Sequence, residues 1–270
     1  MAAMEKANNN TIGQCTSTGQ CSNTHEFRMF GLFYLLERLN SQGHYVRAPI
    51  NYDTLLYYAS QEETLTSLPI QWLGLCIWDI EENFTIPDNF IELVVNCILD
   101  NPHKGYVIFP LYLWNNSVGH ENYVLINCAN KKMYRLEPNG YSKKSSDKFK
   151  ALQLQVVLNM LMGDINNIIS TKKKFNNLFD FEVLEEKNGP HTANPCGFCL
   201  TWTIWMVENF IESKCNYSDM MNEKYNSNDP LLPTRYNNLV YSWGLYMYNF
   251  LSTFLSHSQS KLFMKTSIKI

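Results

Sequence analysis

A histidine and a glutamate stand at the ends of two neighbouring apolar segments. His120 opens "HENYVLINC" and Glu137 closes "KMYRLEPNG", with the polar turn "ANKK" between them. A hairpin of two strands would bring the imidazole and the carboxylate to the same edge of a sheet. An imidazole that accepts a proton and a carboxylate that holds its tautomer form the basic half of a nucleophilic site. A histidine beside a turn can also be simply solvated, and "EPNG" is ordinary turn sequence.

A cysteine later in the chain is a candidate nucleophile. In "TANPCGFCLTW", Asn194 can cap a helix and Pro195 fits its first position, so Cys196 falls in the first turn. The exposed N–H groups and the positive end of the helix macrodipole favour a thiolate there. The same N–H groups can receive an oxyanion. The residues therefore allow covalent catalysis by a thiol, a base and an orienting carboxylate.

Together these motifs resemble one group of enzymes. The segments "GHENYVLIN", "YRLEPNG" and "PCGFCLTWTIWMVENF" are similar to those of cysteine proteases whose chain order is His, acid, Cys. That group includes the adenovirus maturation protease and the ubiquitin-like-protein proteases, and the segments look closest to versions from large DNA viruses. The resemblance covers roughly residues 106 to 212.

The resemblance implies a role for each motif and implies no cofactor and no metal. His120 would be the general base, Glu137 its orienting acid and Cys196, which precedes a glycine, the nucleophile. In versions that end in Gly-aromatic-Cys-x-x-Trp the matching thiol is Cys199, so both cysteines stay candidates.

The stretch before the nucleophile departs from the pattern of the group. These enzymes usually carry a glutamine there to complete the oxyanion hole, and "EEKNGPHTANPC" contains none. We expect Asn188, His191 or Asn194 to take its place, or the hole to be weaker. Trp114, six residues before His120, is a candidate for lining a substrate groove and equally for an edge aromatic of the sheet.

The elements that must position these residues follow from the apolar pattern. We predict three strands, "GYVIFPLYLW" and the two segments above, then a helix in "SDKFKALQLQVVLNMLMGD", a strand in "FDFEVLEE" and a buried helix in "PCGFCLTWTIWMVENFIE". This order describes an α+β domain. With the resemblance, the expected fold is papain-like in reversed chain order. A central, mostly antiparallel sheet would pack on the helix that carries the nucleophile.

Four regions are expected along the chain. Residues 1–24 are polar and would form a flexible arm, and residues 25–104 a mainly helical N-terminal region. Residues 105–215 form the predicted catalytic core. Residues 216–270 would form a C-terminal helical extension packed on the core, because large apolar residues recur there at helical spacing.

The composition argues against nucleic acid as a partner and favours a reducing compartment. A net charge of −3, from 22 basic and 25 acidic residues, gives no electrostatic case for binding nucleic acid in bulk. We find no secretory signal and no run long enough for a transmembrane segment. Most of the eight cysteines lie in apolar runs, which favours free thiols in a reducing compartment. We therefore expect the cytoplasm of a host cell or the inside of a virion.

The preferred hypothesis is a cysteine protease that cleaves peptide or isopeptide bonds in a protein substrate. The resemblance implies either a viral precursor protein during maturation or a ubiquitin-like protein, with an activating partner or peptide as a further expectation. The alternative is a catalytically inactive relative that serves as a virion structural or binding module. An acyltransferase using the same triad would need a coenzyme site, and no Gly-rich phosphate loop supports one.

Other uses of the cysteines have weaker support. Gln20 followed by Cys21 resembles papain-order proteases, whose nucleophile precedes the histidine. A structural zinc site needs a second ligand pair, and no other cysteine or histidine pair has the usual short spacing. A thioredoxin-like redox site places CxxC just after an early strand, whereas "CGFC" comes late and follows a polar loop.

Overall fold

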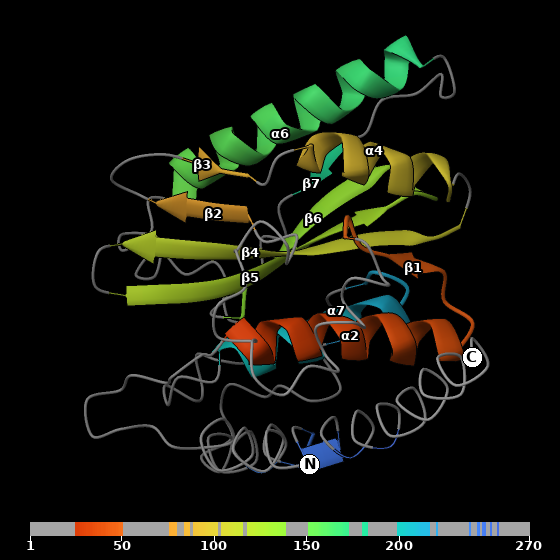
Figure 1. The fold of residues 1–270 in the computed structure, drawn as a ribbon, viewed down its shortest axis with the longest axis vertical. Helices are drawn as coiled ribbons and strands as arrows, with labels where there is room; N and C mark the ends of the chain where they lie inside the picture. The colour runs from red at the N-terminus through yellow and green to blue at the C-terminus, as the bar shows by residue number, and fades with distance from the viewer. Residues whose placement is uncertain are drawn as a thin grey trace, which may run out of the picture.

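The secondary structure is mixed α+β, as the sequence predicted (Figure 1). The computed structural model describes residues 25–50, 76–79, 84–86, 89–101, 104–115, 118–138, 151–172, 180–182 and 199–216, and single residues at 220, 238, 242, 243, 245, 246, 249 and 253. The predicted arm, residues 1–24, lies outside these described residues.

One mixed sheet forms the centre of the described chain. Its strands are β1 (Val46–Arg47), β2 (Cys76–Asp79), β3 (Phe84–Thr85), β4 (Tyr106–Asn115), β5 (Val118–Asn127), β6 (Lys132–Leu136) and β7 (Asp180–Glu182). The order is β3-β2-β4-β5-β6-β7, and β1 pairs with β4 beyond the end of β2. The longest pairings, β4 with β5 and β5 with β6, are antiparallel, while β1 and β2 run parallel to β4 and β7 parallel to β6.

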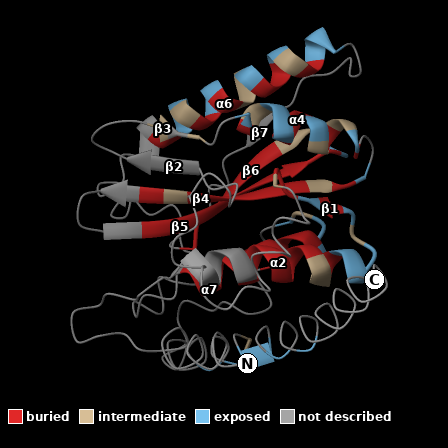
Figure 2. Ribbon diagram, in the orientation of Figure 1, coloured by how far each residue is buried: buried red, intermediate tan, exposed pale blue. Residues whose placement is uncertain are grey.

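Helices cover both faces of the sheet (Figure 1). They are α2 (His25–Ser41), α4 (Phe90–Leu99), α6 (Ala151–Thr171) and α7 (Cys199–Glu212). In the view of Figure 1, α4 and α6 lie above the sheet, and α2 and α7 lie below it. Buried residues follow the strands and the inner sides of the helices, as Figure 2 shows. The result is a three-layer arrangement in which β4 and β5 have both faces covered.

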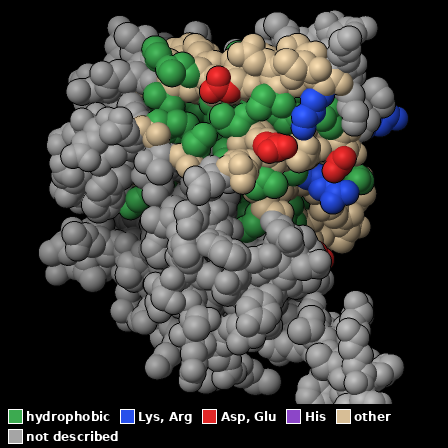
Figure 3. Space-filling model, turned by 45° about the horizontal axis from the view of Figure 1, so that its top comes forward, with side chains coloured by type: hydrophobic (Ala, Val, Ile, Leu, Met, Phe, Trp, Pro, Cys, Tyr) green, Lys and Arg blue, Asp and Glu red, His purple; other side chains and the backbone are tan. Residues whose placement is uncertain are grey.

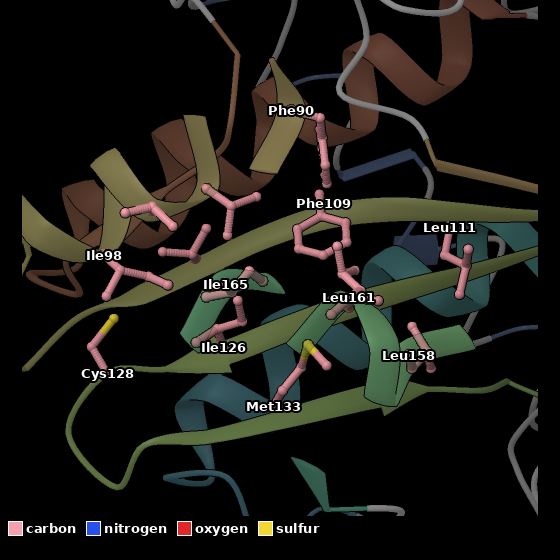
Figure 4. Close-up of a cluster of buried hydrophobic side chains, with 14 of the residues drawn as sticks. Phe90, Ile98, Phe109, Leu111, Ile126, Cys128, Met133, Leu158, Leu161 and Ile165 are labelled. Carbon is pink, nitrogen blue, oxygen red and sulfur yellow. The ribbon is translucent and has the colours of Figure 1, made fainter. Parts of the chain in front are cut away.

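The core between the sheet and the pair α4 and α6 follows from the two-residue period of the strands. Alternate residues of β4, such as Phe109, face this side and meet Phe90 of α4 and Leu161 of α6 (Figure 4). The rings of Phe90 and Phe109 meet edge to face with centroids 5.0 Å apart. Burying each such side chain stabilises the fold by about 1.5–3 kcal/mol.

The outer side of this layer still carries apolar side chains. Met160 and Val156 of α6 are exposed, as is Leu93 of α4. Figure 3 shows hydrophobic side chains of this face interspersed with acidic and basic ones. Singly scattered apolar residues of this kind are normal on a protein surface.

The opposite face of the sheet carries α7, a helix that is apolar on nearly every side. Residues 200–208 of α7 are all buried, because α7 lies between the sheet and α2. The ring of Phe210 packs on Tyr134 of β6 with centroids 5.2 Å apart. A helix that is hydrophobic all round belongs inside a protein, which is why "CLTWTIWMVENF" predicted a buried helix.

The short strands β1, β2 and β3 were not predicted. They come from residues 25–104, the region expected to be mainly helical, and they join the sheet through β4 and β2. The boundary expected between residues 104 and 105 stays a prediction, although hydrogen bonds of the sheet cross it. In the described part of the chain, no helix is both long and apolar enough to span a bilayer.

Candidate active site

The imidazole of His120 and the carboxylate of Glu137 are in direct contact. His120 lies in β5, and Glu137 directly follows β6, the neighbouring antiparallel strand. The distance from Nε2 of His120 to Oε1 of Glu137 is 2.6 Å, at the short end for a charge-assisted hydrogen bond. Both residues are buried, with 4% and 7% of their surface exposed. The two side chains therefore have the geometry of a base and an orienting acid.

Two further side chains, those of Arg135 and Asn122, form hydrogen bonds that continue from Glu137. Neither was predicted as a site residue from the sequence. Nη1 of Arg135 lies 3.2 Å from Oε2 of Glu137 and donates to Oδ1 of Asn122 at 3.0 Å. Asn122 comes two residues after His120, and Arg135 comes two residues before Glu137. Residues two apart in a strand lie on the same face of the sheet. The sequence therefore already indicated that Asn122 lies beside His120 and Arg135 beside Glu137.

These four residues lie at the end of the core formed with α4 and α6. His120 is paired with Leu113 across the β4–β5 ladder. Asn122 is paired with Leu111 in the same ladder. Both leucines belong to the core cluster of that face. Directly paired residues of an antiparallel ladder project to the same side. The buried ionic cluster thus borders apolar side chains of the core, and Coulomb interactions are stronger in such a place than in water.

Helix α7 begins near the same end of β5 but on the other face of the sheet. The hydroxyl of Thr203 donates to the backbone oxygen of Glu121, the neighbour of His120, at 3.1 Å. Seven residues later Phe210 packs on Tyr134, so α7 runs in the same direction as β5. Cys199 opens α7, about 6 Å before Thr203 along the helix axis. The start of α7 is therefore level with His120.

The predicted site residues are described to different extents. Cys196, Asn194, His191 and Asn188 lie outside the described residues, as does Cys21. Cys199 and Trp114 are described only by their places in α7 and at the far end of β4. The structure brings together His120 and Glu137, while the roles of the other predicted residues stay predictions.

Three other thiols are unsuited to act as nucleophiles at neutral pH. Burial raises the pKa of Cys97 to about 11 and that of Cys128 to about 12. Burial likewise raises the pKa of Cys215 to about 11. Because the thiolate is the reactive form, these three thiols are poor nucleophiles, and Cys128 is a small apolar residue of the core. Within the described residues, no group of three or more His, Cys, Asp or Glu side chains could hold a metal ion.

Comparison with known proteins gives one similarity in sequence. No family model matches the chain. The chain is 22% identical over 172 residues to protein L371 of Acanthamoeba polyphaga mimivirus, whose name assigns it ankyrin repeats. The match covers 58% of this chain and 20% of that protein, so this chain spans about a fifth of the length of the curated relative it matches.

Solved structures of the Legionella pneumophila effector protein RavZ are similar to part of the chain. One RavZ structure has a TM-score of 0.39 and 12% sequence identity, covering 63% of this chain and 48% of that chain. A second, in complex with human LC3B, has a TM-score of 0.36 and 12% identity, covering 63% and 46%.

Proposed function

We propose that the chain is a cysteine protease that cleaves peptide or isopeptide bonds. In this proposal Cys196 or Cys199 is the nucleophile, His120 the general base and Glu137 the acid that orients it. The observation that carries the proposal is the buried 2.6 Å contact between His120 and Glu137, at the end of β5 where α7 begins. An imidazole–carboxylate pair near the N-terminus of a helix is an arrangement that activates a thiol.

The reaction would proceed through a thioester. The thiolate attacks the carbonyl carbon of the scissile bond, and backbone N–H groups near the start of α7 receive the oxyanion. The C–N bond then breaks as His120 passes the proton taken from the thiol to the leaving amine. A water molecule, deprotonated by His120, attacks the thioester, and the departing sulfur is reprotonated. Asn188, His191 or Asn194 would assist the oxyanion hole, and Trp114 would line the substrate groove.

The described part of α7 packs on the face of the sheet opposite His120, and the proposed reaction requires the thiol to reach the imidazole. Strand β6 pairs with β5 only from Tyr123 onward, so β5 extends past the end of β6 toward Val118. Among the described residues, the edge of β5 near His120 therefore has no neighbouring strand on the β6 side. The resulting chain order, base, acid and nucleophile, is the reverse of papain. This reversed papain-like order is part of the proposal.

The substrate would be a viral precursor protein or a ubiquitin-like protein, processed in the host cytoplasm or inside a virion. The sequence similarity to a mimivirus protein supports a viral setting. A catalytically inactive relative with a structural or binding role is the competing hypothesis, and the missing glutamine before the cysteines favours it. An activating partner or peptide remains part of the first hypothesis.

The test is labelling with a limiting amount of iodoacetamide at pH 6, followed by peptide mass spectrometry. Ordinary thiols, with a pKa near 8.5, react slowly at this pH, whereas a thiolate paired with an imidazole reacts fast. We expect Cys196 or Cys199 to be labelled first in the wild type and to lose this advantage in His120→Ala.

A matched variant shows whether the effect is specific to His120 or would follow from the loss of another histidine. His44→Ala removes a partly exposed imidazole outside the site, and it should label like the wild type. Fast labelling at Cys21 would favour the papain-order alternative instead. Equal slow labelling of every cysteine would overturn the protease proposal for the isolated chain and favour the inactive relative.

A further inference from the structure

Arg135 is a buried charged residue that contacts Glu137 but has no role in the proposed triad. Only 7% of its surface is exposed. A guanidinium is a permanent cation with no acceptor. Its Nη1 lies 3.2 Å from Oε2 of Glu137, while the other carboxylate oxygen, Oε1, faces Nε2 of His120. One carboxylate therefore lies between a fixed positive charge and an imidazole.

We propose that Arg135 keeps Glu137 ionised and thereby sets the tautomer of His120, with the proton on Nε2 and the lone pair on Nδ1. The tautomer follows from which atoms of Glu137 and His120 can donate a hydrogen bond and which can only accept one. An ionised carboxylate only accepts hydrogen bonds, so the 2.6 Å contact requires a proton on Nε2. In a neutral imidazole the basic lone pair then lies on Nδ1. Arg135 is a positioning residue in this account, because it acts on the imidazole through Glu137.

The charge balance of the buried cluster leads to the same result. With neutral His120, the charges of Arg135 and Glu137 cancel. Without Arg135, the buried carboxylate would lose the cation that lies 3.2 Å from its Oε2, and this loss favours uptake of a proton. That proton would convert His120 to imidazolium, or it would protonate Glu137, which would then donate to Nε2 and leave the imidazole proton on Nδ1. Both outcomes place a proton on Nδ1 and remove its lone pair.

Asn122 holds the guanidinium in place. Its Oδ1 accepts from Nη1 of Arg135 at 3.0 Å. Its Nδ2, although buried, has no hydrogen-bond partner among the described residues. A buried donor without a partner costs about 1–3 kcal/mol. The contact of Oδ1 with Arg135 is therefore the described side-chain hydrogen bond of Asn122.

The tautomer can be read directly from the ¹⁵N chemical shifts of the His120 ring, which distinguish a protonated nitrogen from one with a lone pair. The spectra are recorded at pH 8 in a Cys196→Ala, Cys199→Ala background, so that no thiol proton can reach the imidazole. With Arg135 present we expect a protonated Nε2 and a bare Nδ1. In Arg135→Gln we expect Nδ1 to become protonated at the same pH. In Arg135→Lys, which keeps the charge, the bare Nδ1 should return.

A matched control separates this role from a structural one. Arg38→Gln breaks another Arg–Glu pair, in which a partly exposed Arg38 lies 3.3 Å from the buried Glu208, and it should leave the His120 spectrum unchanged. A bare Nε2 in the background protein, or an unchanged Nδ1 in Arg135→Gln, would overturn the inference. If Arg135→Gln fails to fold, Arg135→Lys and the background spectrum remain as tests: a bare Nε2 in the background protein, or a protonated Nδ1 in Arg135→Lys, would overturn the inference.

This tautomer matters for catalysis only if the proposed protease function is correct. The ¹⁵N experiment, in contrast, can be interpreted whether or not the chain is a protease. Cysteine labelling tests the protease, and the ¹⁵N spectrum tests Arg135 in a protein without the candidate nucleophiles. If Cys196 and Cys199 label slowly but the spectrum is as expected, Arg135 sets the tautomer of His120 in an inactive protein. Fast labelling with the opposite spectrum would leave a protease in which Arg135 has no such role.

Discussion

Three described cysteines have thiols that burial keeps protonated. The pKa values are raised to about 11 for Cys97, about 12 for Cys128 and about 11 for Cys215. At pH 8 an ordinary thiol is partly ionised, so these three should react with iodoacetamide more slowly than a solvent-exposed cysteine by a factor of at least about 100, and Cys128 most slowly. Time-resolved alkylation with peptide mass spectrometry checks this. Unfolded protein in guanidinium is the control, and equal rates in the native and unfolded forms would refute the burial of these thiols.

Glu137 can be tested by a change that keeps its shape. In Glu137→Gln we expect the amide oxygen to turn toward Arg135, which can only donate, and the amide nitrogen to face Nε2 of His120. The imidazole would then carry its proton on Nδ1 and could not act as the base. Labelling of Cys196 or Cys199 at pH 6 should fall to the rate of His120→Ala.

The control for this change is Glu208→Gln, which also alters a buried glutamate paired with an arginine. Both variants should lose stability, since each removes the charge of a buried carboxylate that pairs with a guanidinium. Only Glu137→Gln should slow the labelling. Wild-type labelling in Glu137→Gln would show that the carboxylate does not orient His120.

At the scale of elements, the crossing of α2 and α7 depends on a glycine. A Cβ at Gly31 would overlap Cδ1 of Ile204 and lie 3.1 Å from its Cγ1. We expect Gly31→Ala to destabilise the protein by about 1–3 kcal/mol, reduced by the better helix propensity of alanine. Urea unfolding followed by circular dichroism measures the change.

A double-mutant cycle makes this prediction specific. Ile204→Val removes Cδ1, the atom that a Cβ at Gly31 would meet, and costs about 0.5–1.5 kcal/mol alone. The double variant should be more stable than the sum of the two single changes, by roughly 1 kcal/mol. Gly163→Ala in α6 is the control, because its Cβ would meet nothing within 4 Å, and it should stabilise by about 0.5–1 kcal/mol. Additive effects at positions 31 and 204 would contradict the close approach of the helices.

The elements that the sequence predicted are those long enough to show a period. β4 and β5 each extend over ten residues, and their apolar pattern is visible without tertiary information. β1 and β3 have two residues each, which is too short for any period, so they exist only because β4 and β2 offer an edge. In the site, spacing was enough to pair His120 with Glu137. Arg135 was missed because a charged residue in a strand is usually solvent-facing, and only tertiary packing buries it.

At the scale of the whole molecule, one carboxylate joins three parts of the chain. Glu208 of α7 accepts hydrogen bonds from the hydroxyl of Tyr34 at 2.8 Å and from Nε1 of Trp243 at 3.0 Å. It also lies 3.3 Å from Nε of Arg38. Burial, followed by the charge of Glu208, raises the pKa of Tyr34, so its hydroxyl stays a donor. Residues of α2, of α7 and of the C-terminal part of the described chain thus meet at one buried carboxylate.

Trp243→Phe tests how much this junction stabilises the protein. The substitution keeps an aromatic ring near Tyr34, whose ring now lies 5.6 Å from that of Trp243, but removes the donor to Glu208. We expect a loss of about 1.5–3 kcal/mol in the free energy of unfolding, typical of a hydrogen bond to a charged group, measured by urea unfolding. Tyr246→Phe is the control: Tyr246 is exposed and also packs on Tyr34, so its change should stay within about 0.5 kcal/mol. Equal effects of the two substitutions would mean that ring packing, and not the buried anion, joins the C-terminal residues to α2 and α7.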